Sequence, residues 1–424
     1  MHAAAATRAS LLGFFNTALA SVDPLNLVAN FLPPRPKGRV IVLGAGKASA
    51  RMALAVEQCW PGPLEGLVIT RYLHAEACRQ VEIVEAAHPV PNQAGFDSTQ
   101  RMLKLAQTTG PDDLVVCLVS GGGSSLLTLP APGVSLVDKQ QVNRALLASG
   151  AHIGEMNCVR RHLSAVKNGR LGTACGRARV LTLIISDVPD DDAAIVASGP
   201  TLADGSTAAD ALDILQRYRI VLPASVSAAL HQPEASSAPC FIGQRDHYVI
   251  ATANDALKAV QASAEKSGWH VLNLGAAIEG EAREAGKVLG GLAKHLASTR
   301  GSGAGNHAPL LVLSGGETTV TLRHPQPGRG GRNVEFLLSL GLQTRCLPNL
   351  TALACDTDGI DGSESSAGAV WDTTTMQRAQ ALGLSPLEYL HRHDASTFFS
   401  ALGDLVTTGP TRTNVNDFRA IAIT

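Results

Sequence analysis

A lysine beside two glycines stands in the segment VLGAGKASA, residues 42–50, which follows a β-branched run and opens a helix-like stretch. The segment is not a dinucleotide fingerprint, because Ser49 stands at the third glycine position, and an alanine after the lysine excludes a Walker loop. A glycine turn before a helix still lets backbone N–H groups approach an anion, and the helix start adds a positive dipole end. We therefore expect Gly44 and Gly46 to bind an anion beside Lys47. The alternative is a tight turn with a solvated lysine.

A second glycine-rich stretch, SGGGSSLL at residues 120–127, follows an apolar, strand-like run. Its glycines and serines offer unhindered N–H groups and hydroxyls to a phosphate or a carboxylate. The residues expected to bind substrate or nucleotide here are Ser120, Gly121, Gly122, Gly123, Ser124 and Ser125.

Charged clusters follow other predicted strands. SDVPDDD at 186–192 places four carboxylates in seven residues, and CDTDGIDG at 355–362 adds three more. GRGGRNVEF at 328–336 puts two arginines before a helix, and TTGPTRTNVND at 407–417 supplies hydroxyls and asparagines. Taken singly, acids in the first turn of a helix or exposed arginines are ordinary surface features. Together, at the ends of strands, they indicate a ligand site.

Strand and helix patterns alternate along the chain, which is typical of βαβ units. The first series of expected strands is RVIVL (39–43), GLVIT (66–70), VEIVEA (81–86), LVVCLVS (114–120) and VLTLIIS (180–186). Several are apolar on both faces, as buried parallel strands are. A polar stretch at 230–239 precedes a second series, which begins with HYVIAT. We predict two α/β domains with an active-site cleft between them. Residues 1–236 form a Rossmann-like, doubly wound, mostly parallel sheet, and residues 237–424 a mixed α/β domain.

Composition excludes several classes of protein. The 424-residue chain has a formal net charge of -1, so it lacks the basic character expected for binding nucleic acid or an anionic membrane. No apolar run reaches the roughly 18 residues of a membrane-spanning helix. The apolar stretch at 11–15 is expected in a first helix rather than in a signal peptide. Packing of this helix on the second domain is the alternative to its place in the first, and the sequence leaves the choice open. The eight cysteines include no C-x-x-C pair, so we expect a reduced, cytoplasmic protein without a zinc site. Association between copies of the chain stays open.

Phosphoryl transfer is the chemistry that this set of residues fits. It needs N–H groups and cations around the phosphates, carboxylates that hold Mg²⁺, and a group that orients the acceptor hydroxyl. The sequence contains no G-x-S-x-G elbow that would indicate a serine hydrolase instead.

Nine sequence blocks resemble those of the glycerate 2-kinase family, whose C-terminal half is called the MOFRL domain. In family order they are GAGKAS, HPVPN, SGGGSSLLTLP, NCVRRHLSAVKNGRL, SDVPDDDAAIVASGPT, SGGETTVTL, GRGGRNVEF, DTDGIDGSESSAGAV and TGPTRTNVND. They extend from near residue 40 to the C-terminus. The sequence departs from the family pattern at Asp190, where glycine is usual, at Val334, where glutamine is usual, and at Asn92, where aspartate is common. The lysine, the arginines and most of the carboxylates remain.

The resemblance implies ATP-dependent phosphorylation of D-glycerate at its C2 hydroxyl, giving 2-phosphoglycerate and ADP, with Mg²⁺ or another divalent cation. It points to Lys47 and Arg332 as catalytic groups. We expect Lys47 to neutralise charge on the transferring phosphoryl group and Arg332 to clamp a phosphate or the glycerate carboxylate. Asp187 is expected to orient the acceptor hydroxyl or to hold Mg²⁺. The remaining candidates are Asp191, Asp356 and Asp358 for the metal, and Arg329, Asn414 and Asn416 for substrate or nucleotide.

Two other functions fit parts of the sequence. An NAD(P)-dependent hydroxypyruvate reductase would act on a similar three-carbon acid. The missing third glycine at Ser49 argues against it, as does the lack of an acid in ribose-binding register after VEIVEAAHP. A non-catalytic sensor of phosphorylated sugars or acids would use the glycine loops alone and leave the charged clusters unexplained. D-Glycerate and ATP are therefore the expected partners, without nucleic acid or a membrane.

Overall fold

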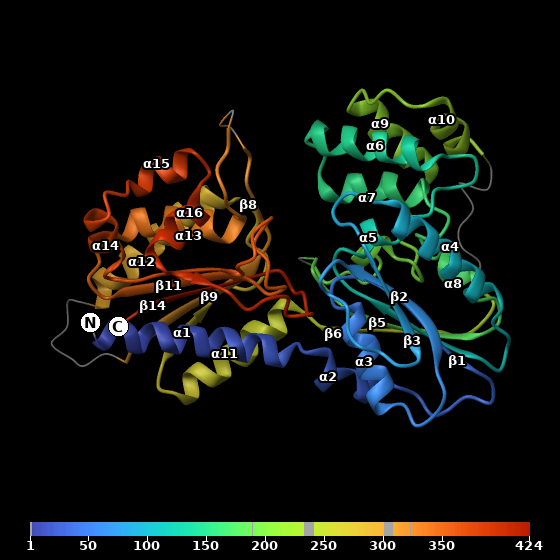
Figure 1. Cartoon of the computed structure of the whole chain (residues 1–424), viewed down its shortest axis with the longest axis horizontal. Coiled ribbons are helices and arrows are strands. Elements are labelled where there is room, and N and C mark those ends of the chain that lie inside the picture. The colour runs from blue at the N-terminus through green and yellow to red at the C-terminus, as the bar shows by residue number, and fades with distance from the viewer. Residues whose placement is uncertain (1, 189, 233–240, 301–307, 323, 325) are drawn as a thin grey trace. The chain divides into compact units, whose positions relative to one another are not determined.

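Two compact units make up the chain in the computed structural model (Figure 1). The structure describes residues 2–188, 190–232, 241–300, 308–322, 324 and 326–424. Residues 24–250 form one unit, here called the N-terminal unit. Residues 1–23 and 251–424 form the other, here called the C-terminal unit. The boundary expected at 236/237 lies outside the described residues, and the division between the two units falls at 250/251 instead.

The N-terminal unit is built on a six-stranded sheet with the order β3-β2-β1-β4-β5-β6. Its strands are β1 Val40–Ala45, β2 Glu65–Arg71, β3 Val81–Ala86, β4 Leu114–Val119, β5 Arg179–Ile185 and β6 Arg245–Ala251. The pairs from β3 to β5 are all parallel. This is the strand order of a Rossmann sheet, which reverses between β1 and β4, so the predicted fold class is confirmed.

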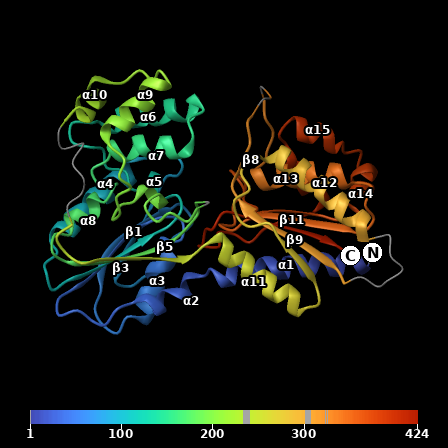
Figure 2. The ribbon, with the colours of Figure 1, turned by 180° about the vertical axis from the view of Figure 1, so that it is seen from behind.

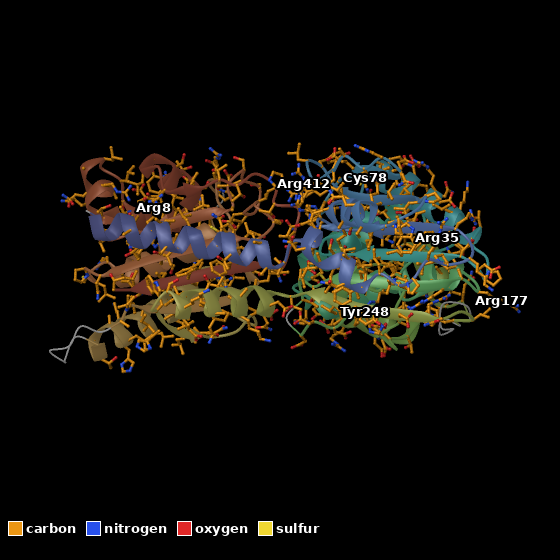
Figure 3. All side chains as sticks on the ribbon, turned by 90° about the horizontal axis from the view of Figure 1, so that it is seen from below. Arg8, Arg35, Cys78, Arg177, Tyr248 and Arg412 are labelled. Carbon is orange, nitrogen blue, oxygen red and sulfur yellow. The ribbon has the colours of Figure 1, made fainter. Side chains whose placement is uncertain are left out.

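Strand β6 was expected to open the second sheet, and it lies instead beside β5 at the edge of the first. Its Tyr248 packs against Phe31 of the same unit, with ring centroids 5.4 Å apart; Figure 3 labels Tyr248. Several residues of this strand are exposed or half-buried. Its sequence pattern therefore did not indicate to which sheet the strand belongs. Because β6 pairs with β5, the division between the units lies after this strand rather than before it.

Helices cover both faces of the first sheet, as expected for a doubly wound fold. Ile41 and Leu43 of β1 lie in one core with Met102, and side-chain alternation directs Val42 to the opposite face, where α3 packs. The helical elements of this unit are α2 Pro24–Leu27, η1 Val28–Phe31, α3 Ser49–Cys59, α4 Gln93–Gln107, α5 Gly123–Leu126, α6 Leu136–Ser149, α7 Ile153–His162, α8 Arg170–Ala174, η2 Val196–Ser198, α9 Ala208–Arg217 and α10 Ala224–Leu230.

Four of these helices, α6, α7, α9 and α10, gather on the far side of α5 from the sheet (Figures 1 and 2). They enclose a small apolar core of their own, which includes Val142, Val159, Leu215 and Val226. These four helices form a helical layer of the unit, and α6 and α7 line a pocket together with Ser124 and Ser125 of α5.

The C-terminal unit contains a second six-stranded sheet, with the order β13-β12-β11-β14-β9-β7. Its pairs are antiparallel except for β7 with β9, which confirms the predicted mixed α/β structure. The strands are β7 His270–Asn273, β9 Leu310–Gly316, β11 Leu350–Asp356, β12 Gly368–Trp371, β13 Leu405–Val406 and β14 Asp417–Ile423. A separate two-stranded pair in this unit joins β10, Thr318–Thr319, to β8, Gly280–Glu281.

Helices lie on both faces of this second sheet as well (Figures 1 and 2). They are α1 His2–Ser21 and α11 Ala253–Lys266 on one face, and α12 Ala282–Arg300, α13 Arg332–Thr344, α14 Thr375–Ala381, α15 Pro386–His391 and α16 Ala395–Leu402 on the other. Phe15 of α1 is 1% exposed and packs on Phe418 of β14, with ring centroids 5.7 Å apart. Arg8, labelled in Figure 3, pairs with Asp404 at 2.6 Å. These contacts place residues 1–23 in the C-terminal unit, which corrects their expected place in a domain of residues 1–236.

Within the described residues, no single helix meets the length and apolarity that a membrane crossing requires; one bent pair, Ala5–Ser21 with Pro24–Phe31, meets them on those criteria alone.

Candidate functional site

The loops that follow β1 and β4 are joined by hydrogen bonds at Ser120 and Gly121. The Lys47 N–H donates to the Gly121 carbonyl at 2.9 Å, and the Ala48 N–H donates to Ser120 Oγ at 3.0 Å. Gly46 has a φ of 148°, and a side-chain carbon at this position would overlap Ser120 Oγ. The glycine is therefore needed for the close approach of the two loops, and this approach holds the backbone of Lys47 in place.

The side chain of Lys47 extends beside the glycine-rich loop. A side-chain carbon on Gly122 would lie 3.3 Å from Lys47 Cγ and 3.2 Å from two ring atoms of His88. Gly122 has a φ of 78° and immediately precedes α5, so it serves the turn and leaves room for both neighbours. His88 was not among the expected site residues, and its only signal in the sequence was its place in the HPVPN block.

Both loops emerge at the carboxyl ends of adjacent parallel strands, where the strand order reverses. Open α/β sheets bind ligands at this position, in the crevice beyond the strand ends. Asp187 follows β5, which pairs with β4, and so belongs to the same edge of the sheet. Asp191 lies further along that loop, with a φ of 53°. The glycine-rich loops, Lys47 and Asp187 thus follow the carboxyl ends of neighbouring strands in one sheet.

Ser124, in the first turn of α5, contacts a buried lysine that the sequence analysis missed. Lys167 Nζ donates to the Ser124 carbonyl oxygen at 2.5 Å and lies 2.9 Å from Ser124 Oγ, which also bonds to Ser198 Oγ at 2.9 Å. Burial, followed by the charges of nearby cations, holds the pKa of Lys167 well below its usual range. Its only signal in the sequence was its place in the NCVRRHLSAVKNGRL block.

In the C-terminal unit, Arg332 is the first residue of α13, and three carboxylates surround its guanidinium group. Nε donates to Asp417 and Nη2 to Asp356, both at 2.8 Å, and Nη1 contacts Glu317. Burial alone would lower the pKa of Arg332, but the charges of these three acids outweigh it and hold the pKa well above its usual value. Glu317 and Asp417 were not expected site residues, although they lie in the blocks SGGETTVTL and TGPTRTNVND. The blocks alone do not reveal that these acids pair with Arg332.

Asp361 closes the N-terminus of α13. Its carboxylate accepts the N–H groups of Asn333 at 3.0 Å and Val334 at 2.9 Å, where the helix dipole favours a negative charge. Burial nevertheless dominates and raises the pKa of Asp361 from its ordinary value of 3.8 to about 6. The charge of Asp417 acts in the same direction.

Four further expected residues of this unit, Asp358, Arg329, Asn414 and Asn416, do not contact the Arg332 guanidinium in the described interactions. Asp358 is fully buried and bonds through its N–H to Asp356 Oδ1 at 3.0 Å, so these two acids are neighbours. Arg329 pairs with Glu364 at 2.6 Å rather than with the acids around Arg332. Asn414 and Asn416 are both buried, and the Asn416 carbonyl accepts the Thr357 N–H at 3.1 Å.

The three expected metal candidates are Asp191, Asp356 and Asp358, and they are divided between the two units. Asp191 belongs to the N-terminal unit and the other two to the C-terminal unit. Asp356 directs one oxygen to Arg332 and the other to the Asp358 N–H, while Asp358 Oδ1 accepts the Ile360 N–H at 2.8 Å. Across the described ranges of the chain, no cluster of three or more His, Cys, Asp or Glu side chains is arranged to hold a metal ion.

The fold and these two groups of residues define a two-unit α/β protein with a glycine-rich loop beside a lysine on one sheet and an arginine–carboxylate group on the other. Residues 10–231 match the family described as "Domain of unknown function (DUF4147)", and residues 310–417 match the MOFRL family. A D-glycerate 2-kinase of Thermotoga maritima is 36% identical over 94% of this chain and 94% of its own length.

A protein of Agrobacterium vitis, provisionally named a hydroxypyruvate reductase, is 50% identical over 98% of this chain and 94% of its own. The crystal structure of a glycerate kinase from Thermotoga maritima aligns with a TM-score of 0.86 at 34% identity, covering 99% of this chain and 100% of the other. The chain belongs to the glycerate kinase family, and the resemblance found in its motifs is confirmed.

Gly46→Ala tests the junction between the two loops. The added methyl group would displace Ser120, so we expect a loss of about 2–3 kcal/mol in the free energy of unfolding, measured by urea denaturation. Gly133→Ala is the matched control, because Gly133 also has a positive φ of 82° but nothing within 4 Å of the added carbon. Equal losses in the two variants would show that backbone strain alone, rather than contact with Ser120, requires glycine at position 46.

Asp361→Asn tests the buried carboxylate at the start of α13. Because its folded pKa is raised, the folded state binds more protons than the unfolded state between pH 3.8 and about 6, and stability falls as pH rises through that range. The stability difference between variant and native protein should therefore shift in favour of the variant from about pH 5 to about pH 7. Asp210→Asn, at an exposed carboxyl whose pKa is lowered, should show no such shift. A constant difference for Asp361→Asn in urea denaturation would contradict the assignment.

Proposed function

We propose that this protein transfers the γ-phosphoryl group of ATP to the C2 hydroxyl of D-glycerate, giving 2-phosphoglycerate and ADP. The observation that carries the proposal is the junction between the two loops at the switch point of the first sheet, where Lys47 extends beside the Ser120–Ser125 loop. Membership of the glycerate kinase family supports the substrate and the reaction.

In this proposal, Lys47 stabilises negative charge on the transferring phosphoryl group. A fixed cation that meets charge developing in the transition state lowers the barrier without reorganising at the moment of reaction. The turn at Gly121–Gly123, with Ser124 and Ser125, offers N–H and hydroxyl groups to the anion. Gly44, Gly46 and Ser120 are engaged in β1 and in the junction between the two loops, so they position this turn. Asp187, at the same sheet edge, orients the acceptor hydroxyl.

Arg332 would bind a phosphate by exchanging one of its three carboxylate partners. Asp356 and Asp417 are buried, so they hold the guanidinium plane in position. The side chain of Glu317 is 46% exposed, and its contact with Nη1 is the one that a ligand can replace without burying an unpaired charge. We propose that Arg332 offers this nitrogen to the ligand and keeps its two buried partners.

Mg²⁺ enters the proposal as part of the nucleotide complex. It commonly binds through one or two carboxylates together with substrate phosphates and retains several waters, so it needs no complete cage of protein ligands. When bound, it would neutralise phosphate charge, and Asp191, Asp356 and Asp358 remain its candidate contacts. Arg329, Asn414 and Asn416 remain candidates for binding substrate or nucleotide. The described cysteines are all free, which supports a reducing, cytoplasmic location.

Reduction of hydroxypyruvate is the second candidate, because the relative from Agrobacterium vitis carries that name. Strand β2 ends at Arg71, near the position where a Rossmann enzyme for NADP places an arginine against the 2′-phosphate. Against it, Ser49 replaces the third glycine and bonds to Ser120 Oγ at 3.1 Å. The Lys47 side chain also extends beside Gly122, where a cation suits a transferring phosphoryl group. The balance favours the kinase.

Parallel assays decide between the two activities. We expect turnover with D-glycerate and MgATP, none with hydroxypyruvate and NADH or NADPH, and none with D-glycerate and ATP after chelation of the metal. Phosphorus NMR of the reaction mixture should show 2-phosphoglycerate. Predominant 3-phosphoglycerate would contradict the proposed acceptor hydroxyl, and reduction of hydroxypyruvate without phosphoryl transfer would overturn the proposal.

Lys47→Ala tests the lysine. We expect kcat to fall roughly 100- to 1000-fold with the fold intact, because the charge acts on the transition state more than on bound substrate. Lys47→Arg should restore little of the rate, since a guanidinium differs from an ammonium in shape and reach. Lys104→Ala, which removes an exposed lysine of α4, is the control and should keep native turnover. Near-native kcat for Lys47→Ala at saturating substrates would refute the role.

A further inference from the structure

Three cationic side chains line one pocket of the N-terminal unit, and the residues that line it include no carboxylate. Lys139 comes from α6, Arg160 from α7, and Lys167 from the turn before α8. Lys139 is 7% exposed and Lys167 1%, so both ammonium groups are removed from bulk water. Buried cations are ordinarily paired with acids, and this group therefore requires an explanation.

In the interactions that the structure describes, these three cations donate hydrogen bonds only to neutral groups. Lys139 Nζ donates to the Leu163 carbonyl at 3.0 Å, and Arg160 Nε donates to Asn143 Oδ1 at 2.7 Å. Lys167 Nζ bonds to Ser124, as described above. An ammonium has three donors and a guanidinium has five, so donors remain for a further acceptor.

The three charges also act on one another. Burial, and then the charge of Arg160, lowers the pKa of Lys139 to about 7. The pKa of Lys167 is held well below its usual range by burial, with Lys139 and Arg160 among the further causes. An anion placed among them would relieve both the mutual repulsion and the unmet need for counter-charge.

The dimensions of the pocket select a small group. The space that a water-sized sphere can occupy within it is about 20 Å³, which is room for little more than one water. Leu136, Val142 and Leu146 of α6 also line it, and such apolar walls strengthen electrostatic attraction by excluding water. A planar carboxylate has two oxygens that can accept from two ammonium groups and from the fork of a guanidinium.

We propose that this pocket, formed by Lys139, Arg160, Lys167 and Ser124, binds the carboxylate of the acceptor acid and makes the protein selective for acids over neutral alcohols. The assignment rests on the proposed kinase function. Ser124 and Ser125 belong both to this pocket and to the glycine-rich loop, and Gly122, beside Lys47, is only two residues away. Two residues span at most about 7 Å of chain, so the pocket and the residue beside Lys47 belong to one short segment.

Lys139→Met tests the pocket, because methionine keeps an unbranched side chain and removes the charge. We expect the KM for D-glycerate to rise roughly 10- to 100-fold, the loss typical of a hydrogen bond between charged groups, while the KM for ATP changes less than about twofold. The preference for D-glycerate over its uncharged amide, glyceramide, should shrink by a similar factor. The unliganded variant should melt at a higher temperature than the native protein, because a buried charge is gone.

Arg144→Met is the matched control, since Arg144 is an exposed cation on the same helix. It should leave both KM values and the selectivity unchanged. An unchanged KM for D-glycerate in Lys139→Met would overturn the proposal. A raised KM for ATP instead would also overturn it and assign the pocket to a nucleotide phosphate. Arg160→Met provides a second variant with the same expected pattern should Lys139→Met fail to fold.

Equilibrium binding separates this proposal from the proposed function. Calorimetric titration of the full chain with D-glycerate, in the presence of ADP, should show binding that weakens in Lys139→Met and not in Arg144→Met. If the native protein turns over no D-glycerate but still binds it in this pattern, the kinase assignment fails and the carboxylate pocket stands. If native turnover is normal and binding does not depend on Lys139, the pocket assignment fails alone.

Discussion

The close approach of the loops after β1 and β4 is the constraint on which the first unit depends. Ser120 is fully buried and bonds to the Ala48 N–H and to Ser49 Oγ, so one hydroxyl joins the end of β4 to the start of α3. This contact requires Gly46 and fixes the course of the chain through Lys47. A switch point in a parallel sheet provides a crevice, and this hydrogen-bonded junction places a lysine beside a glycine-rich turn at that edge of the sheet.

The cations of the N-terminal pocket and Arg332 of the C-terminal unit differ in whether carboxylates surround them. The N-terminal unit places Lys139, Arg160 and Lys167 in one pocket that contains no acid among its lining residues. The C-terminal unit surrounds Arg332 with three acids and keeps Asp361 at the start of the same helix. In the first arrangement the missing counter-charge favours an anionic ligand. In the second the excess of carboxylates holds a guanidinium rigidly and limits which partner a ligand can replace.

Most of the first sheet could be predicted from the sequence, because strands buried on both faces are continuous apolar runs. The place of β6 could not be predicted, because a half-exposed edge strand fits either sheet. The sequence of α1 likewise did not indicate on which sheet the helix packs. The glycine loops and Lys47 were found because tight turns require glycine at fixed spacing. Lys167 and Asp417 were missed although they lie in recognised blocks, because the blocks do not reveal their contacts with Ser124 and Arg332, which lie far away in the sequence.

Uncompensated burial of cations has a cost that the rest of the unit must offset. A pKa that is lower by one unit corresponds to about 1.4 kcal/mol of free energy against the charged form. Burial lowers the pKa of Lys139 from 10.5 to about 7. The apolar core of α6, α7, α9 and α10 adjoins this pocket and supplies packing that can offset the cost. A fold selected only for stability would place an acid or an apolar side chain there. The cations at this position therefore favour a ligand that supplies the negative charge, so that binding recovers free energy which folding alone does not.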